Sequence, residues 1–188
     1  MLYTRKGDGG TTKSFSSKER FSKASDLGEA LGSLDELNSF VGLCKVRARQ
    51  VQDSSVMVGK KEHAISDILF DVQENLFIVQ AEVAGAPKKV TKPKITKMEK
   101  LIDAIEQELP PITSFVIAGG SEVSAMLDVA RTVARRTERR VVHVHEQEIQ
   151  KVGKHTLAYV NRLSSLLYAL ARLANHKSGI SEESPTYK

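Results

Sequence analysis

The sequence predicts an all-α protein, a five-helix bundle of mostly antiparallel helices that follows an extended N-terminal arm. Five segments carry apolar residues at spacings of three and four, which is the period of an amphipathic helix. No segment alternates apolar and polar residues over a useful strand length. Aromatic residues make up only 5% of the 188 residues and tryptophan is absent. Small aliphatic side chains must therefore fill the core, which suits packed helices better than a sheet sandwich.

The first 24 residues are rich in Gly, Ser, Thr and Lys and show no helical period, which indicates an extended or looped arm. A first helix is expected over residues 25–49, with Leu34 and Leu37 on its apolar side. Residues 50–61 are polar and are expected to connect this helix to the next one.

The second helix is expected over residues 62–84, where the apolar spacing again alternates between three and four. Residues 85–93 (G-A-P-K-K-V-T-K-P) contain a glycine and two prolines, which predict a loop. The third helix is expected over residues 94–109. It should stop at the Pro110-Pro111 pair, because proline lacks the backbone N–H that a helix interior needs.

Residues 115–121 (F-V-I-A-G-G-S) form an apolar segment that ends in a glycine pair. The fourth helix follows, and either Ser121 or Ser124 is expected to cap it, because a serine hydroxyl accepts a free N–H of the first turn. This helix is expected to fade within residues 143–153.

The fifth helix is expected over residues 154–177, and residues 178–188 predict a loose tail. The whole chain, 1–188, suits one domain with a real core. The single Cys44 excludes an intrachain disulfide and fits a reducing compartment. No apolar run could span a membrane and the polar start does not resemble a signal peptide, so a cytoplasmic protein is expected. A formal charge of +5 permits an anionic partner without identifying it.

Residues 127–140 (L-D-V-A-R-T-V-A-R-R-T-E-R-R) concentrate charge within the fourth helix and predict an anion-binding face. At about 100° per residue, Arg131, Arg135 and Glu138 fall at i, i+4 and i+7 and form one stripe. Arg139 lies at its edge, and the other arginines point further round. Arginine offers a planar fork that holds phosphate or carboxylate in two places. The alternative is a solvated helix face whose charges form ion pairs with one another.

The motif T-R-K-G-D-G-G-T-T at residues 4–12 carries a second anion-binding signal. Closely spaced glycines let backbone N–H groups turn toward an anion, and the threonine, arginine and lysine side chains add donors. The motif is not a Walker A loop, because no G-K-[ST] follows four variable residues. On its own the motif also fits a flexible turn. It supports anion binding because the same chain contains the arginine helix.

A few other polar residues are candidates for a site. Asp35 and Glu36 could each orient an arginine of another helix, or face water. Asn161 could bond a ribose, a phosphate or a neighbouring helix. His143 and His145 lie two residues apart and so diverge on a helix, which is why no metal site is predicted there. The sequence contains no evident Ser-His-Asp set, Cys-His set or carboxylate pair for acid–base catalysis.

These pieces, in this order, resemble the PduO-type ATP:cob(I)alamin adenosyltransferases. The matching segments span nearly the whole chain and are T-R-K-G-D-G-G-T-T at 4–12, G-S-L-D-E-L-N-S at 32–39, F-V-I-A-G-G-S at 115–121, A-R-T-V-A-R-R-T-E-R-R at 130–140 and N-R-L-S at 161–164. Their combination is specific. The chain departs from the family pattern at Ala118, Ser165 and Tyr168, and the last two positions fall near the expected corrinoid end.

The resemblance implies a transferase that moves the 5′-deoxyadenosyl group of ATP to the cobalt of cob(I)alamin, giving adenosylcobalamin and triphosphate. It implies a homotrimer in which ATP, with Mg²⁺, is held between the arm of one subunit and the arginine helix of its neighbour. By this resemblance the ATP-binding residues are Thr4, Arg5, Gly7, Asp8, Gly9, Thr11, Lys23, Arg135, Arg136, Glu138, Arg139 and Asn161.

The resemblance also assigns catalytic roles to three residues. Asp35 would pair with Arg131 across the subunit interface, and Phe115 would pack beneath the corrinoid and keep its lower ligand away from cobalt. A corrinoid reductase is implied as a partner, whereas no nucleic acid, membrane or protein-bound metal site is expected. Because cob(I)alamin is itself a strong nucleophile, the protein needs to supply only position and anion stabilisation.

Two other functions fit the same charges. A basic helical module could bind nucleic acid through the arginine face, although Asp128 and Glu138 interrupt the positive field and few aromatic residues are present for stacking. A purely structural bundle would use its charged stripes only as ion pairs between helices.

Overall fold

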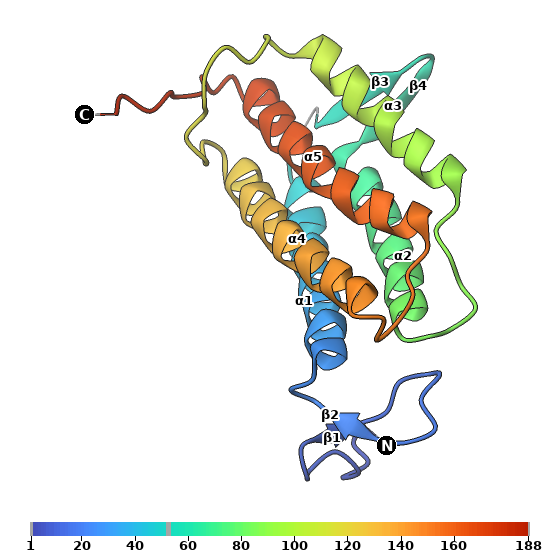
Figure 1. The fold of residues 1–188 in the computed structure, drawn as a ribbon. Coiled ribbons are helices and arrows are strands. Elements are labelled where there is room, and N and C mark those ends of the chain that lie inside the picture. Colours follow the sequence, from blue (N-terminus) through green and yellow to red (C-terminus); the bar gives the residue numbers. More distant parts are fainter. Residues whose placement is uncertain (1, 52–53, 188) are drawn as a thin grey trace.

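The computed structural model describes residues 2–51 and 54–187, which form five helices and two small antiparallel sheets (Figure 1). The helices are α1 (Asp26–Ala48), α2 (Ile65–Val83), α3 (Lys92–Glu108), α4 (Glu122–Glu146) and α5 (Lys154–Lys177). The strands are β1 (Thr11–Thr12), β2 (Phe21–Ser22), β3 (Ser55–Val58) and β4 (Lys61–Ala64). The predicted five-helix bundle is thus confirmed.

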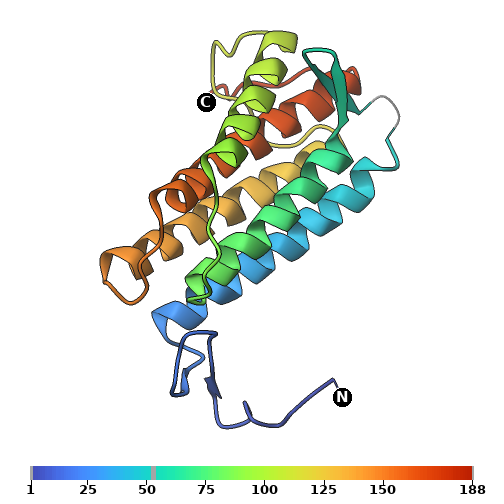
Figure 2. The same cartoon turned by 90° about the vertical axis from the view of Figure 1, so that its right-hand side faces the viewer.

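Helix α4 lies between α1 and α5, α2 packs on α1, and α3 covers part of α5 (Figures 1 and 2). Aliphatic side chains fill the space between them, as the low aromatic content predicted. Fully buried leucines come from four of the helices: Leu34, Leu37, Leu69, Leu76, Leu127, Leu163, Leu166, Leu167 and Leu170. Each buried leucine contributes roughly 2 kcal/mol relative to an exposed one, so this shared core holds the helices together.

Two serine caps set the starts of α1 and α4. Ser25 Oγ accepts the Gly28 N–H at 3.2 Å, and Ser121 Oγ accepts the Ser124 N–H at 3.2 Å. Ser121 is therefore the cap, and Ser124 lies inside the helix. Helix α3 begins slightly earlier than expected, because Pro93 sits in its first turn, where no backbone N–H is needed.

The expected polar connection at residues 50–61 is wrong in part, because it contains most of a β-hairpin. Strands β3 and β4 pair with Ser55 opposite Ala64 and Val58 opposite Lys61. Val56 is buried against the bundle and fixes the hairpin in place. Residues 52 and 53 of this connection lie outside the described residues.

The arm lies beyond the N-terminal end of α1 (Figures 1 and 2). Strands β1 and β2 pair within it, and the Lys23 N–H donates to Gly10 O at 2.9 Å. The arm approaches α1 closely at Gly28, where a Cβ would lie 2.3 Å from Lys23 O, so only glycine fits there. Met1 lies outside the described residues.

The expected loose tail is wrong for the residues around 182–184. Glu182 pairs with Arg172 of α5, and Glu183 O accepts the Ile117 N–H at 2.8 Å. The physical reason is that Arg172 is buried and needs a carboxylate partner, which only the returning tail supplies. Residue 188 lies outside the described residues. Within the described part of the chain, no helix is both long and apolar enough to cross a membrane.

Candidate functional site

Helix α4 sorts its side chains by face as the period predicted. Ala130, Val133, Ala134, Thr137 and Val141 are all buried. The Thr137 hydroxyl donates to Ser33 O of α1 at 3.1 Å, which satisfies the one polar group on this face. The arginines of α4 lie on the remaining faces: Arg136 and Arg140 face α1, Arg135 and Arg139 face a depression, and Arg131 pairs with Asp128.

The first group, Arg136 and Arg140, faces α1. Arg136 Nη2 lies 2.6 Å from Glu36 Oε2, and Arg140 Nη2 lies 2.9 Å from Glu29 Oε2. Arg140 also donates to the Ser33 hydroxyl. In a single chain these two arginines therefore hold α4 against α1. Glu36 does orient an arginine of another helix, as one of its two sequence interpretations proposed.

The second group, Arg135 and Arg139, opens onto a depression between α4 and α5. Asn161 Nδ2 donates to Glu138 Oε1 at 2.7 Å across the two helices, and Arg139 Nη1 donates to Arg135 O at 3.2 Å. The depression, of about 480 Å³, is lined by Arg135, Glu138, Arg139, Val142, His143, Glu146 and Asn161. Four of the predicted ATP-binding residues are thus brought together.

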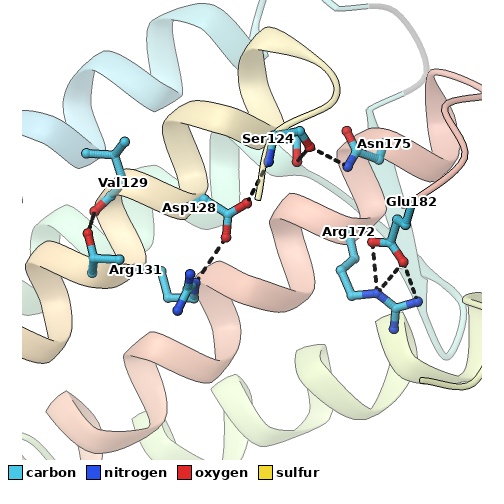
Figure 3. A network of polar contacts seen from close by, with 9 residues as sticks. Ser124, Asp128, Val129, Arg131, Arg172, Asn175 and Glu182 are labelled. Carbon is cyan, nitrogen blue, oxygen red and sulfur yellow. Dashed lines mark hydrogen bonds and ion pairs between the residues drawn. The ribbon is translucent and has the colours of Figure 1, made fainter. Parts of the chain in front are cut away.

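Arg131 lies further toward the N-terminus of α4, on the same side. Its Nε lies 3.0 Å from Asp128 Oδ1 (Figure 3). Its guanidinium stands 5.7 Å from the centre of the Tyr168 ring. Asp128 Oδ2 also accepts the Gly119 N–H at 3.3 Å. Within one chain Arg131 thus pairs with Asp128, and the exposed Asp35 remains a predicted partner across a subunit interface.

The glycine turn before α4 is held by α5 as well as by α4. Asn175 Nδ2 donates to Gly119 O at 2.8 Å, and Asn175 Oδ1 accepts the Ser121 N–H at 2.9 Å. Gly120 has φ of 109°, and a Cβ there would lie 2.5 Å from Asn175 Oδ1. Sequence reasoning missed Asn175. The available signal was an amide that follows the apolar residues Leu170, Leu173 and Ala174 near the end of the fifth helix.

Phe115 projects from the loop between α3 and α4 and is 78% exposed. Ile112 and Ile117 on the same loop are also exposed. Three exposed apolar residues on one short loop form a surface that suits a large apolar ligand better than water.

The predicted arm residues form a separate structure. The Asp8 N–H donates to Arg5 O at 3.3 Å, and Lys23 Nζ lies 3.0 Å from the position that a Cβ on Gly7 would take. Thr4, Arg5, Asp8 and Gly9 are exposed, while Gly7 and Thr11 are half-buried. Among the described residues, none of the arm lines the depression of the same chain.

The histidines of α4 have separate partners. His143 Nε2 lies 3.3 Å from Asp26 Oδ2, whereas His145 Nδ1 accepts the Val152 N–H at 3.2 Å. Residues 2–51 and 54–187 contain no group of three or more His, Cys, Asp or Glu side chains placed to hold a metal ion.

Fold and site together define a helical bundle with an arginine-lined depression between α4 and α5 and exposed apolar residues on the loop that precedes α4. The chain belongs to the cobalamin adenosyltransferase family, whose sequence model matches residues 2–174.

Similar curated proteins are corrinoid adenosyltransferases. That of Bacillus subtilis is 35% identical over 96% of this chain and 90% of its own length. The corrinoid adenosyltransferase PduO of Citrobacter freundii is 39% identical over 93% of this chain. The chain spans about half the length of that relative, and a similar share of the PduO of Salmonella typhimurium.

Solved structures of the same type share the fold. A variant of the PduO-type ATP:corrinoid adenosyltransferase from Lactobacillus reuteri, complexed with cobalamin and ATP, gives a TM-score of 0.85 at 27% identity. The alignment covers 99% of this chain and 97% of that one. Another variant, complexed with ATP, gives 0.83 at 28% identity, over 98% of this chain and 99% of that one.

Proposed function

We propose that this protein transfers the 5′-deoxyadenosyl group of ATP to the cobalt of cob(I)alamin, with triphosphate as the other product. The observation that carries the proposal is the grouping of Arg135, Arg139 and Asn161 around one depression. Family membership and the fold shared with adenosyltransferases that bind ATP and cobalamin support it.

The reaction makes few chemical demands on the protein. An electron pair of cobalt(I) forms the new bond to C5′, and the C5′–O bond of ATP breaks as triphosphate leaves with that bond's electrons. The protein must align the two substrates and stabilise the negative charge that builds on the leaving triphosphate. Arg135 and Arg139 suit the second task, because their guanidinium groups reach open solvent beside Glu138, which is already bonded to Asn161.

Mg²⁺ belongs with the nucleotide in this proposal. Mg²⁺ keeps several waters and usually binds phosphate oxygens with only one or two carboxylates. The depression offers the carboxylates of Glu138 and Glu146. This donor set fits an ion that arrives with ATP, and the ion would supply further charge neutralisation for the triphosphate.

The arm requires a second subunit in this proposal. Thr4, Arg5, Asp8 and Lys23 are exposed in one chain, and Asp35 is exposed on α1. In a homotrimer the arm of one subunit would hold the phosphates over the arginine helix of its neighbour, with Asp35 paired to Arg131 across the interface. Light scattering should give three copies, and a stable, active monomer would contradict the assembly.

The apolar loop would receive the corrinoid. Phe115 would pack beneath the corrin ring and keep the lower ligand away from cobalt. The electron that reduces cobalt would come from a separate reductase in the cytoplasm.

The direct test is to mix the protein with chemically reduced cobalamin and Mg·ATP and to follow the corrinoid spectrum. Appearance of the adenosylcobalamin spectrum is expected, and its absence would refute the proposal. A thermal shift adds a second readout. Mg·ATP should raise the melting temperature and duplex DNA should not, whereas the opposite response would favour the nucleic-acid function.

A further inference from the structure

The C-terminal tail is bound to the loop that carries Phe115. Arg172 of α5 is only 8% exposed, and its Nε lies 3.0 Å and 2.9 Å from the two carboxylate oxygens of Glu182 (Figure 3). Arg172 Nη2 also donates to Pro110 O at 3.1 Å. One buried guanidinium thus joins the tail to Pro110, the second residue after α3.

Two further bonds tie the tail to the loop on either side of Phe115. The Ile117 N–H donates to Glu183 O at 2.8 Å, and the hydroxyls of Ser114 and Ser184 lie 2.7 Å apart. Phe115 itself is 78% exposed, so its own side chain does little to fix its position. Its backbone is therefore set by bonds at 114 and 117.

We propose that residues 180–184, anchored by the Arg172–Glu182 ion pair, position Phe115 for the corrinoid substrate. This inference rests on the proposed function. Arg172 and Glu182 are positioning residues, because they act through the loop and touch no reacting atom. A separate cavity lies between the tail and the loop, where Pro110, Arg172 and Glu182 are among its lining residues. In the part of the chain that the structure describes, it shares no lining residue with the arginine-lined depression, the proposed ATP site. The tail should therefore affect the corrinoid and leave ATP binding unchanged.

The test compares Glu182→Gln with Glu183→Gln in the full-length protein. Glu182→Gln removes the charge that holds Arg172, whereas Glu183 contributes only its backbone carbonyl to the loop, so Glu183→Gln is the matched control. Glu182→Gln should raise the KM for cob(I)alamin or lower the rate by about tenfold, as displaced positioning groups do. The KM for ATP should stay at the wild-type value.

Hydrogen exchange supplies a readout that needs no activity. Amide exchange in peptides containing Ile117 should be about tenfold faster in Glu182→Gln, because the Ile117 N–H loses its acceptor when the tail detaches. Ser184→Ala, which removes one hydroxyl bond, should change the same peptides by a smaller factor and serves if Glu182→Gln does not fold.

The outcomes separate the two proposals. Unchanged exchange at Ile117, or equal changes in the KM for both substrates, would refute the positioning role even if the wild-type protein is active. Absence of adenosylation by the wild-type protein would refute the proposed function and the corrinoid role with it. Faster exchange in that case would show that the tail holds the loop for another purpose.

Discussion

The two ends of the α4–α5 pair treat their charged groups in opposite ways. At the loop end, Arg172 is buried and its guanidinium is bonded to Glu182 and to a backbone carbonyl. At the arginine end, Arg135 is exposed, and Glu138, which lines the same depression, accepts a hydrogen bond from Asn161.

This contrast teaches that the same residue type stabilises the fold at one end and, in the proposed function, binds a ligand at the other. A buried charge must be paired within the fold, because its desolvation is costly. An exposed arginine has no such requirement, and its planar fork stays available for a phosphate. The charges at the loop end are thus paired within one chain, whereas Arg135 at the arginine end stays exposed to solvent.

Removing the charge should lower the free energy of unfolding at the loop end and leave it nearly unchanged at the arginine end. Arg172→Ala leaves Glu182 mostly buried without its partner, so it should lower the free energy of unfolding by about 3 kcal/mol. Arg135→Ala removes an exposed side chain and should change it by less than about 0.5 kcal/mol. Urea denaturation followed by circular dichroism measures both. Equal losses would break the comparison.

Replacing the planar guanidinium of Arg135 by another positive charge should lower the rate of catalysis and leave the fold unchanged. Arg135→Lys keeps the charge but loses the two-pronged contact, which should slow adenosylation by about a hundredfold, or about 3 kcal/mol. The assay is the initial rate at saturating cob(I)alamin, with circular dichroism to confirm the fold.

The control for Arg135→Lys is Arg49→Lys. Arg49 is exposed at the other end of the bundle, just after α1. Arg140 would be a poor control, although it lies on the same helix, because it bonds to Glu29 and Ser33 of α1. If Arg135→Lys and Arg49→Lys are equally active, the arginine face is only a solvated surface.

Alkaline pH should lower the free energy of unfolding through buried core groups, independently of the arginines at the two ends. Burial raises the pKa of Cys44 from its usual 9.0 to about 11, and it raises the pKa of Tyr159 as well. Above pH 9 the unfolded thiol loses its proton while the folded one keeps it, so stability falls between about pH 9 and 11. The slope from one such group is at most about 1.4 kcal/mol per pH unit.

Urea denaturation of wild type and Cys44→Ala across this range measures that slope. The variant should lose less stability per pH unit, because one of the two buried groups no longer titrates. Parallel curves for the two proteins would contradict the assignment to Cys44.

The smallest effect is expected for tryptic cleavage of the N-terminal arm. In the proposed function the arm binds the same nucleotide as the arginine end. Its exposed Arg5, Lys6 and Arg20 are trypsin sites. Mg·ATP should slow cleavage there by at least about threefold, because binding stabilises the ordered arm. Cleavage within the bundle serves as the internal reference. Equal rates with and without Mg·ATP would remove the arm from the nucleotide site.

Several features followed from the sequence because they depend on local spacing. The five helices and the separation of Arg135 from Arg136 reflect the helical period, which neighbouring residues share. The cap of α4 was left open between Ser121 and Ser124, and the structure assigns it to Ser121. The hairpin β3–β4 was not predicted, because each strand has only four residues. Val56 is the fully buried residue of the two strands. So short a pattern does not reveal a period of two.

By itself, then, the sequence determined which residues share a helix face and which family the motifs resemble. Tertiary structure alone decided which charges meet. Arg136 forms an ion pair with Glu36, a hundred residues away in the sequence. Arg172 pairs with Glu182 because the tail turns back after α5. The reason is that periodicity is a property of one segment, whereas an ion pair depends on where packing brings two segments together. In the proposed function, the partners of Asp35 and of the arm depend in the same way on a second subunit.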